Sequence, residues 1–342
     1  MIVVGCYFGI TPWNMNRLSI DESDLSFSIL IFGIFFVLSN QIAGRILVPK
    51  YGTKIVMSLA FPLITFSTLL SIISPSYFYF LLTFIPAGIG WGASGPIGGI
   101  HCQLIEKHFK KIITPYYAMG FNIGILVGGG LAGIIMRYSF EPFMFFLVLS
   151  FSSILVALLV LHLGLPSNLD FKGKGEKFKI PESNVLIFGF LLFFVFGSGG
   201  IIMDWSTLWL SKDLNTPLYL ASMGLIFFSI GGILANLFSN TLINLFTEKV
   251  VGCHFVMIGA SIMLLSLLTN NFYIILGVLC IYGFAIANLV PIVIRQAVKQ
   301  SNESIPMTVT NLITIGLSST MIMPAAIGFL AETFSLTLNM YL

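Results

Sequence analysis

Ten long apolar segments dominate the chain and restrict what it can fold into. They cover residues 25–43, 55–73, 77–102, 116–136, 143–163, 185–203, 219–238, 250–268, 272–294 and 307–330. Each can cross the hydrocarbon core of a bilayer, roughly 30 Å thick, as a helix. Lipid offers the backbone no hydrogen bonds, and the alternating polarity of barrel strands is absent. The segments therefore predict an all-α polytopic membrane protein.

The composition agrees with this prediction. Charged residues make up 8% of the 342 residues and hydrophobic residues 57%, whereas a soluble domain carries about 25% charged residues. The net charge of +3 gives no nucleic-acid-binding footprint. The four cysteines lie far apart, and no hydrolase or ATP-binding signature occurs. The sequence thus predicts a lipid bilayer as the surroundings, no cofactor and no enzymatic activity.

The basic residues predict an orientation. If residues 14–24 lie outside and the sides then alternate, 13 lysines and arginines fall inside and 3 outside. Segments 103–113 and 166–183 then face the cytoplasm, and 204–217 faces outward. We expect a multi-pass protein of the cell membrane, which is the inner membrane in a Gram-negative bacterium.

The polar stretch 166–183 predicts a division into two helical halves, 1–165 and 184–342. A shift of 192 residues aligns Trp13 with Trp205, and several apolar segments correspond in the same order. On this offset the first helix would begin before Met1 and the last would continue past Leu342. We therefore expect both of these helices to be incomplete, with poor stability and little transport from the chain.

Short motifs indicate a family. The stretch GRILVPKYGTK (44–54) resembles the signature loop of the major facilitator superfamily, except that Val48 and Pro49 stand where that loop has an aspartate. The stretches GITPWN (9–14), GGIIMDWSTLWL (199–210) and GFAIANLVP (283–291) look like the fucose-permease-like branch. The resemblance implies the major facilitator fold, with two six-helix halves. It also implies a secondary transporter that moves a small polar solute, with sugars as one candidate class, by alternating access.

Polar and aromatic side chains at membrane depth are candidates for the solute site, because polar groups are costly in a bilayer. An asparagine near an aromatic ring could bind a solute hydroxyl. The residues that we expect to line or gate the site are Trp13, Asn14, Trp91, Tyr117, Asn122, Asp204, Trp205, Asn288 and Asn311.

Each candidate has a plainer interpretation. The asparagines could form hydrogen bonds between helices, and Asp204 could lie at the membrane surface. The glycines of 88–99 favour close helix packing over a nucleotide loop. His101, Cys102, Glu106 and His108 do not predict a metal site. For the whole chain, the alternative is a non-transporting membrane protein or a non-functional remnant of a transporter. The sequence sets neither the coupling ion nor the oligomeric state.

Overall fold

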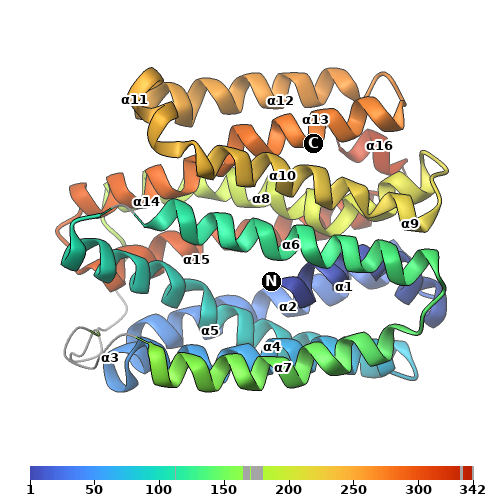
Figure 1. The fold of residues 1–342 in the computed structure, drawn as a ribbon, viewed down its shortest axis with the longest axis horizontal. Coiled ribbons are helices and arrows are strands. Elements are labelled where there is room, and N and C mark those ends of the chain that lie inside the picture. The colour runs from blue at the N-terminus through green and yellow to red at the C-terminus, as the bar shows by residue number, and fades with distance from the viewer. Residues whose placement is uncertain (112, 165–169, 171–179, 332–333, 341–342) are drawn as a thin grey trace.

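The structure is a computed structural model that describes residues 1–111, 113–164, 170, 180–331 and 334–340, and its regular elements in those residues are all helices. Figure 1 shows them lying nearly parallel or antiparallel along one axis. Their bounds are α1 (Ile2–Leu18), α2 (Glu22–Ile42), α3 (Val48–Tyr51), α4 (Thr53–Ile73), α5 (Tyr77–Phe109), α6 (Thr114–Arg137), α7 (Pro142–Leu163), α8 (Ser183–Lys212), α9 (Leu218–Ala221), α10 (Met223–Leu237), α11 (Ser239–Lys249), α12 (Phe255–Ser266), α13 (Phe272–Ala287), α14 (Leu289–Gln300), α15 (Ile305–Ala331) and α16 (Leu336–Asn339).

Within the described residues, ten helical stretches are long and apolar enough to cross a membrane. They coincide with the ten segments read from the sequence, so the prediction of an all-α polytopic membrane protein is confirmed. Several of the stretches join consecutive elements. Thus α2 runs through a π-helical turn (Ala43–Leu47) into α3. The chain is kinked at Thr247 within α11, and after this kink it runs through a second π-helical turn (Val250–His254) into α12.

The stretch 44–54 is mostly helix, which corrects the expectation of a loop. The helix continues to Tyr51, and only Gly52, at φ +83°, turns the chain into α4. Pro49 has no N–H to donate, and the π-helical turn just before it accommodates the missing bond. Segment 103–113 is likewise helical as far as Phe109. We call this end of the bundle, with α3 and the end of α5, the basic end.

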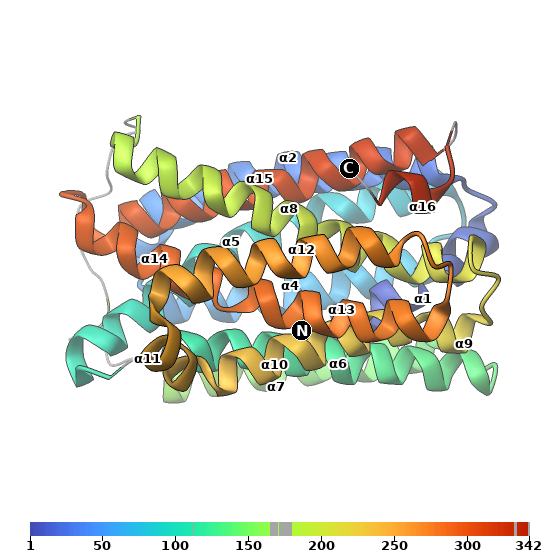
Figure 2. The ribbon, with the colours of Figure 1, turned by 90° about the horizontal axis from the view of Figure 1, so that it is seen from above.

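The helices pack as two groups, which Figure 1 shows mostly one above the other and which overlap when they are seen from above in Figure 2. Helices α1, α2, α4, α5, α6 and α7 contact one another in the first group, and α8, α10, α12, α13 and α15 in the second. The groups meet chiefly where α2 packs on α15 and α6 on α10. Most of the predicted linker 166–183 lies outside the described residues.

Two backbone turns recur along the chain. Ser19 ends α1 in the left-handed region at φ 53°, and Asn215, which is 196 residues later, follows α8 at φ 51°. Gly52 (φ 83°, ψ 166°) and Thr247 (φ 70°, ψ 155°) are 195 residues apart and share an unusual conformation. The recurrence is three to four residues longer than the offset of 192 expected from the sequence.

Carboxylates stabilise the helix starts at the basic end. Asp170 accepts hydrogen bonds from the backbone N–H of Thr53 (2.8 Å) and from its hydroxyl (2.9 Å), so a residue of the expected linker caps α4. Glu106 does the same for α6, accepting from the N–H groups of Ile113 and Thr114, both at 2.7 Å. Asp170 thereby supplies a carboxylate beside Gly52, at the end of the 44–54 stretch.

Candidate functional site

A cavity of about 460 Å³ lies between the two helix groups. Helices α1, α2, α4, α5 and α6 of the first group contribute to its walls. From the other side come α8, α10, α13, α14 and α15. The volume falls in the range of small-molecule sites, about 300–1,000 Å³. A solute held here would contact both groups at once.

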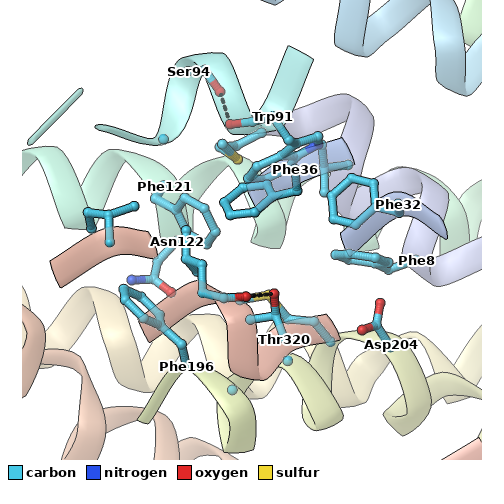
Figure 3. A pocket seen from close by; sticks show the side chains of 18 of the residues that line it. Phe8, Phe32, Phe36, Trp91, Ser94, Phe121, Asn122, Phe196, Asp204 and Thr320 are labelled. Atoms are coloured by element: carbon cyan, nitrogen blue, oxygen red, sulfur yellow. Dashed lines mark hydrogen bonds between the residues drawn. The ribbon is translucent and has the colours of Figure 1, made fainter. Parts of the chain in front are cut away.

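Aromatic rings form much of the cavity wall, as Figure 3 shows. Phe32 and Phe36 of α2 stack with their centroids 6.0 Å apart. Trp91 of α5 meets Phe121 of α6 edge to face at 6.5 Å. Phe8 of α1 completes this side of the cavity. Residues four apart share a face of a helix, which explains why 32 and 36 project together.

Polar side chains are a minority of the wall, and most of their hydroxyl donors already bond other protein groups. The hydroxyl of Ser94 donates to the carbonyl of Trp91 (3.0 Å), and that of Thr320 donates to the carbonyl of Leu317 (2.7 Å). The side-chain amide of Asn122 donates to the carbonyl of Ala118 (3.1 Å). A solute would therefore find acceptor oxygens in the wall, such as Oδ1 of Asn122.

Asp204 is the one acidic residue in the described lining, and it projects from α8 into the cavity on the side of Phe8 (Figure 3). It has no hydrogen bond or ion pair among the described residues. Cations at the same end have other partners. Lys212 pairs with Glu22, and Arg17 donates to the side chain of Asn14 and to backbone carbonyls of α4 and its end. Among the described residues, therefore, no cation pairs with this carboxylate in the aromatic cavity.

Four of the nine residues expected at the site line the cavity: Trp91, Tyr117, Asn122 and Asp204. The other five lie outside its lining, and packing or polar contacts account for them. The indole of Trp13 lies under the guanidinium of Arg17 at 5.6 Å. Asn14, 2% exposed, accepts from the same guanidinium at 2.8 Å.

The remaining three bind neighbouring helices. Trp205 is fully buried and donates its indole N–H to the carbonyl of Pro324 (2.9 Å). The side-chain amide of Asn288 donates to the carbonyl of Ala235 on α10 (2.9 Å). Asn311 belongs to a network at the basic end, described next. Interhelical hydrogen bonds of this kind are the plainer role that the sequence analysis gave for the asparagines.

Arg45 links the two helix groups at the basic end. Arg45 is 7% exposed, and its guanidinium donates to Oδ1 of Asn311 on α15 (2.8 Å) and to Oε1 of Gln41 (2.5 Å). Asn311 in turn donates to Glu303 (3.1 Å), and Gln41 donates to Thr314 on α15 (2.5 Å). This network closes the interface between α2 and α15 on the basic side of the cavity.

Sequence reasoning missed the phenylalanines of the wall. Phe32 and Phe36, four residues apart, carried a usable signal, as did Tyr117 and Phe121 on α6. The chain contains 33 phenylalanines, however, and helices that are apolar on all sides do not show which face meets a cavity.

Comparison with known proteins identifies the fold. A family model described as the Major Facilitator Superfamily matches residues 1–323. The chain belongs to the major facilitator superfamily. An uncharacterised transporter of this superfamily from Yersinia pestis is 24% identical over 339 residues, covering 96% of this chain and 85% of that protein. As a superfamily member, the chain is a multi-pass membrane transporter and not an enzyme.

Two solved structures share this superfamily fold with the chain. The nucleoside transporter NupG aligns with a TM-score of 0.68 at 12% identity, covering 99% of this chain and 94% of that one. The human organic anion transporter MFSD10 aligns with a TM-score of 0.69 at 15% identity, covering 98% and 86%. At these identities the likeness concerns the fold alone.

Proposed function

We propose that this superfamily member carries a small amphipathic organic solute, which binds in the cavity between the two helix groups. The observation that carries the proposal is the cavity itself, walled by aromatic rings and lined by both groups. Rocking of one group against the other would expose such a site first to one side of the membrane and then to the other.

The lining favours a solute with a substantial apolar body. A sugar presents several hydroxyl groups, each of which loses free energy when it is buried without a partner. The hydroxyls of Ser94 and Thr320 already donate within their own helices, and Trp91, Phe36 and Phe121 offer flat apolar surface. A sugar, which the likeness to the fucose-permease-like branch suggests, is the competing candidate.

A ligand screen on the purified transporter separates these candidates. The panel contains sugars, nucleosides and small aromatic amphiphiles, and the readout is the thermal unfolding midpoint, which a bound ligand raises by mass action. We expect the amphiphiles to raise it and then to be transported in proteoliposomes. Stabilisation by sugars alone would contradict the proposed solute class.

A matched pair of glycine variants tests the site. Gly199 lines the cavity, and a Cβ there would come no closer than 4.0 Å to Ile286, so Gly199→Leu should fill cavity space without a backbone clash. Gly277 on α13 is exposed, and a Cβ at that position would meet nothing within 4 Å, so Gly277→Leu is the control. Filling the cavity should abolish ligand stabilisation and flux. Equal behaviour of the two variants would place the solute elsewhere.

A further inference from the structure

We propose that Asp204 makes the cavity selective for organic cations, an inference that rests on the proposed solute site. The solute would carry its positive charge against this carboxylate and its apolar body against the aromatic wall. The first support is the position of Asp204 in the lining of a cavity between two helix groups.

The second support is the missing counter-charge. A carboxylate at membrane depth is costly unless a cation or hydrogen-bond donors compensate it. The described residues give Asp204 neither, because their ion pairs join Lys212 to Glu22 and Arg295 to Glu248. Arg17 donates to Asn14 and to carbonyls of α4 and its end, not to this carboxylate. A cationic solute would supply the missing charge.

The third support is the set of rings around the carboxylate. Phe8 and Phe32 lie on the same side of the cavity as Asp204 (Figure 3). The face of an aromatic ring attracts a cation, by about 0.5–2 kcal/mol depending on desolvation. The same rings bind an apolar body, whereas an organic anion would meet the negative carboxylate. The arrangement therefore discriminates by charge as well as by shape.

Tetraphenylphosphonium is a suitable probe, because it combines a fixed positive charge with aromatic surface. Its equilibrium binding is measured on the purified full-length transporter, both unaltered and with Asp204→Asn. The control is Glu141→Gln, which changes an exposed carboxyl at the start of α7. We expect saturable binding that Asp204→Asn weakens about thirtyfold or more, as when one member of a buried charge pair is removed. Glu141→Gln should bind as the unaltered chain does.

A charge comparison keeps the test decisive if Asp204→Asn folds poorly. Tetraphenylborate has the same shape and the opposite charge, and measured separately on the unaltered chain it should bind far more weakly. Binding of both ions with equal affinity, no saturable phosphonium binding, or unchanged binding to folded Asp204→Asn would each overturn the inference. The proposed function fails separately, if filling the cavity at Gly199 leaves uncharged ligands bound and transported.

Discussion

Replacing Asn311 with alanine removes a hydrogen-bond acceptor from the buried guanidinium of Arg45, where α2 meets α15. The Arg45 Nη2 to Asn311 Oδ1 bond is 2.8 Å long, and Arg45 is only 7% exposed, so water cannot easily replace the lost partner. A hydrogen bond to a charged group contributes about 1.5–3 kcal/mol to stability. Gln41 still binds the same guanidinium. We therefore expect Asn311→Ala to lower the free energy of unfolding by about 2 kcal/mol.

The assay is reversible unfolding in mixed micelles of a mild detergent and dodecyl sulfate. A double-mutant cycle with Arg45→Met isolates the contact, and we expect a coupling energy of about 1.5 kcal/mol. Asn240→Ala is the control, since Asn240 is exposed on α11 and its side chain makes no hydrogen bond to the described residues. A destabilisation by Asn311→Ala that does not exceed the control, or strictly additive single changes, would refute the reasoning.

Three further predictions use the same unfolding assay, with ligand binding as a second readout. Trp205→Phe should cost about 1–3 kcal/mol, because it removes a buried hydrogen bond to a carbonyl of α15 and leaves a void beside the smaller ring. It should leave binding intact, and weakened binding to a stable variant would contradict this. Asn122→Ala should weaken binding more than stability and Asn288→Ala the reverse, because only the first lines the cavity; equal effects would contradict the assignment. Gly52 and Thr247 both have backbone angles suited to glycine. Gly52→Ala should therefore lower the free energy of unfolding by about 1–3 kcal/mol, and Thr247→Gly should raise it. Changes of the opposite sign would show that backbone strain does not act at these positions.

The ten membrane helices could be predicted because the requirement behind them is simple. A segment in lipid must be apolar and must satisfy its own backbone, so length and hydropathy suffice. The same argument fails at helix ends. The helix through Gly44 and Lys50 extends past its apolar part. Lys50 reaches water and the buried Arg45 has hydrogen-bond partners, while the backbone stays hydrogen-bonded. Within the predicted loop 44–54, the chain turns only at Gly52.

The site was harder to predict because an intramembrane polar residue has two uses. Asn122 and Asn288 look alike in the sequence, yet one faces the cavity and the other binds a carbonyl of α10. The difference depends on which side of each helix meets its neighbour, and apolar flanks carry no periodic signal for it. Asp204 differs from Asn311 in the same way. Asn311 finds a buried arginine across the interface, whereas Asp204 finds an open cavity.

The central claim is that the cavity opens to each side of the membrane in turn. Ser94 lines the cavity, so a single cysteine at Ser94→Cys, in a chain whose four native cysteines are replaced by alanine, reports its exposure. The transporter is reconstituted in one orientation, and an impermeant maleimide is added to either side. We expect labelling from both sides, slowed by bound ligand, and no labelling of the exposed control position Gly277→Cys on α13. Labelling of Ser94→Cys from one side only, under all conditions, would contradict it.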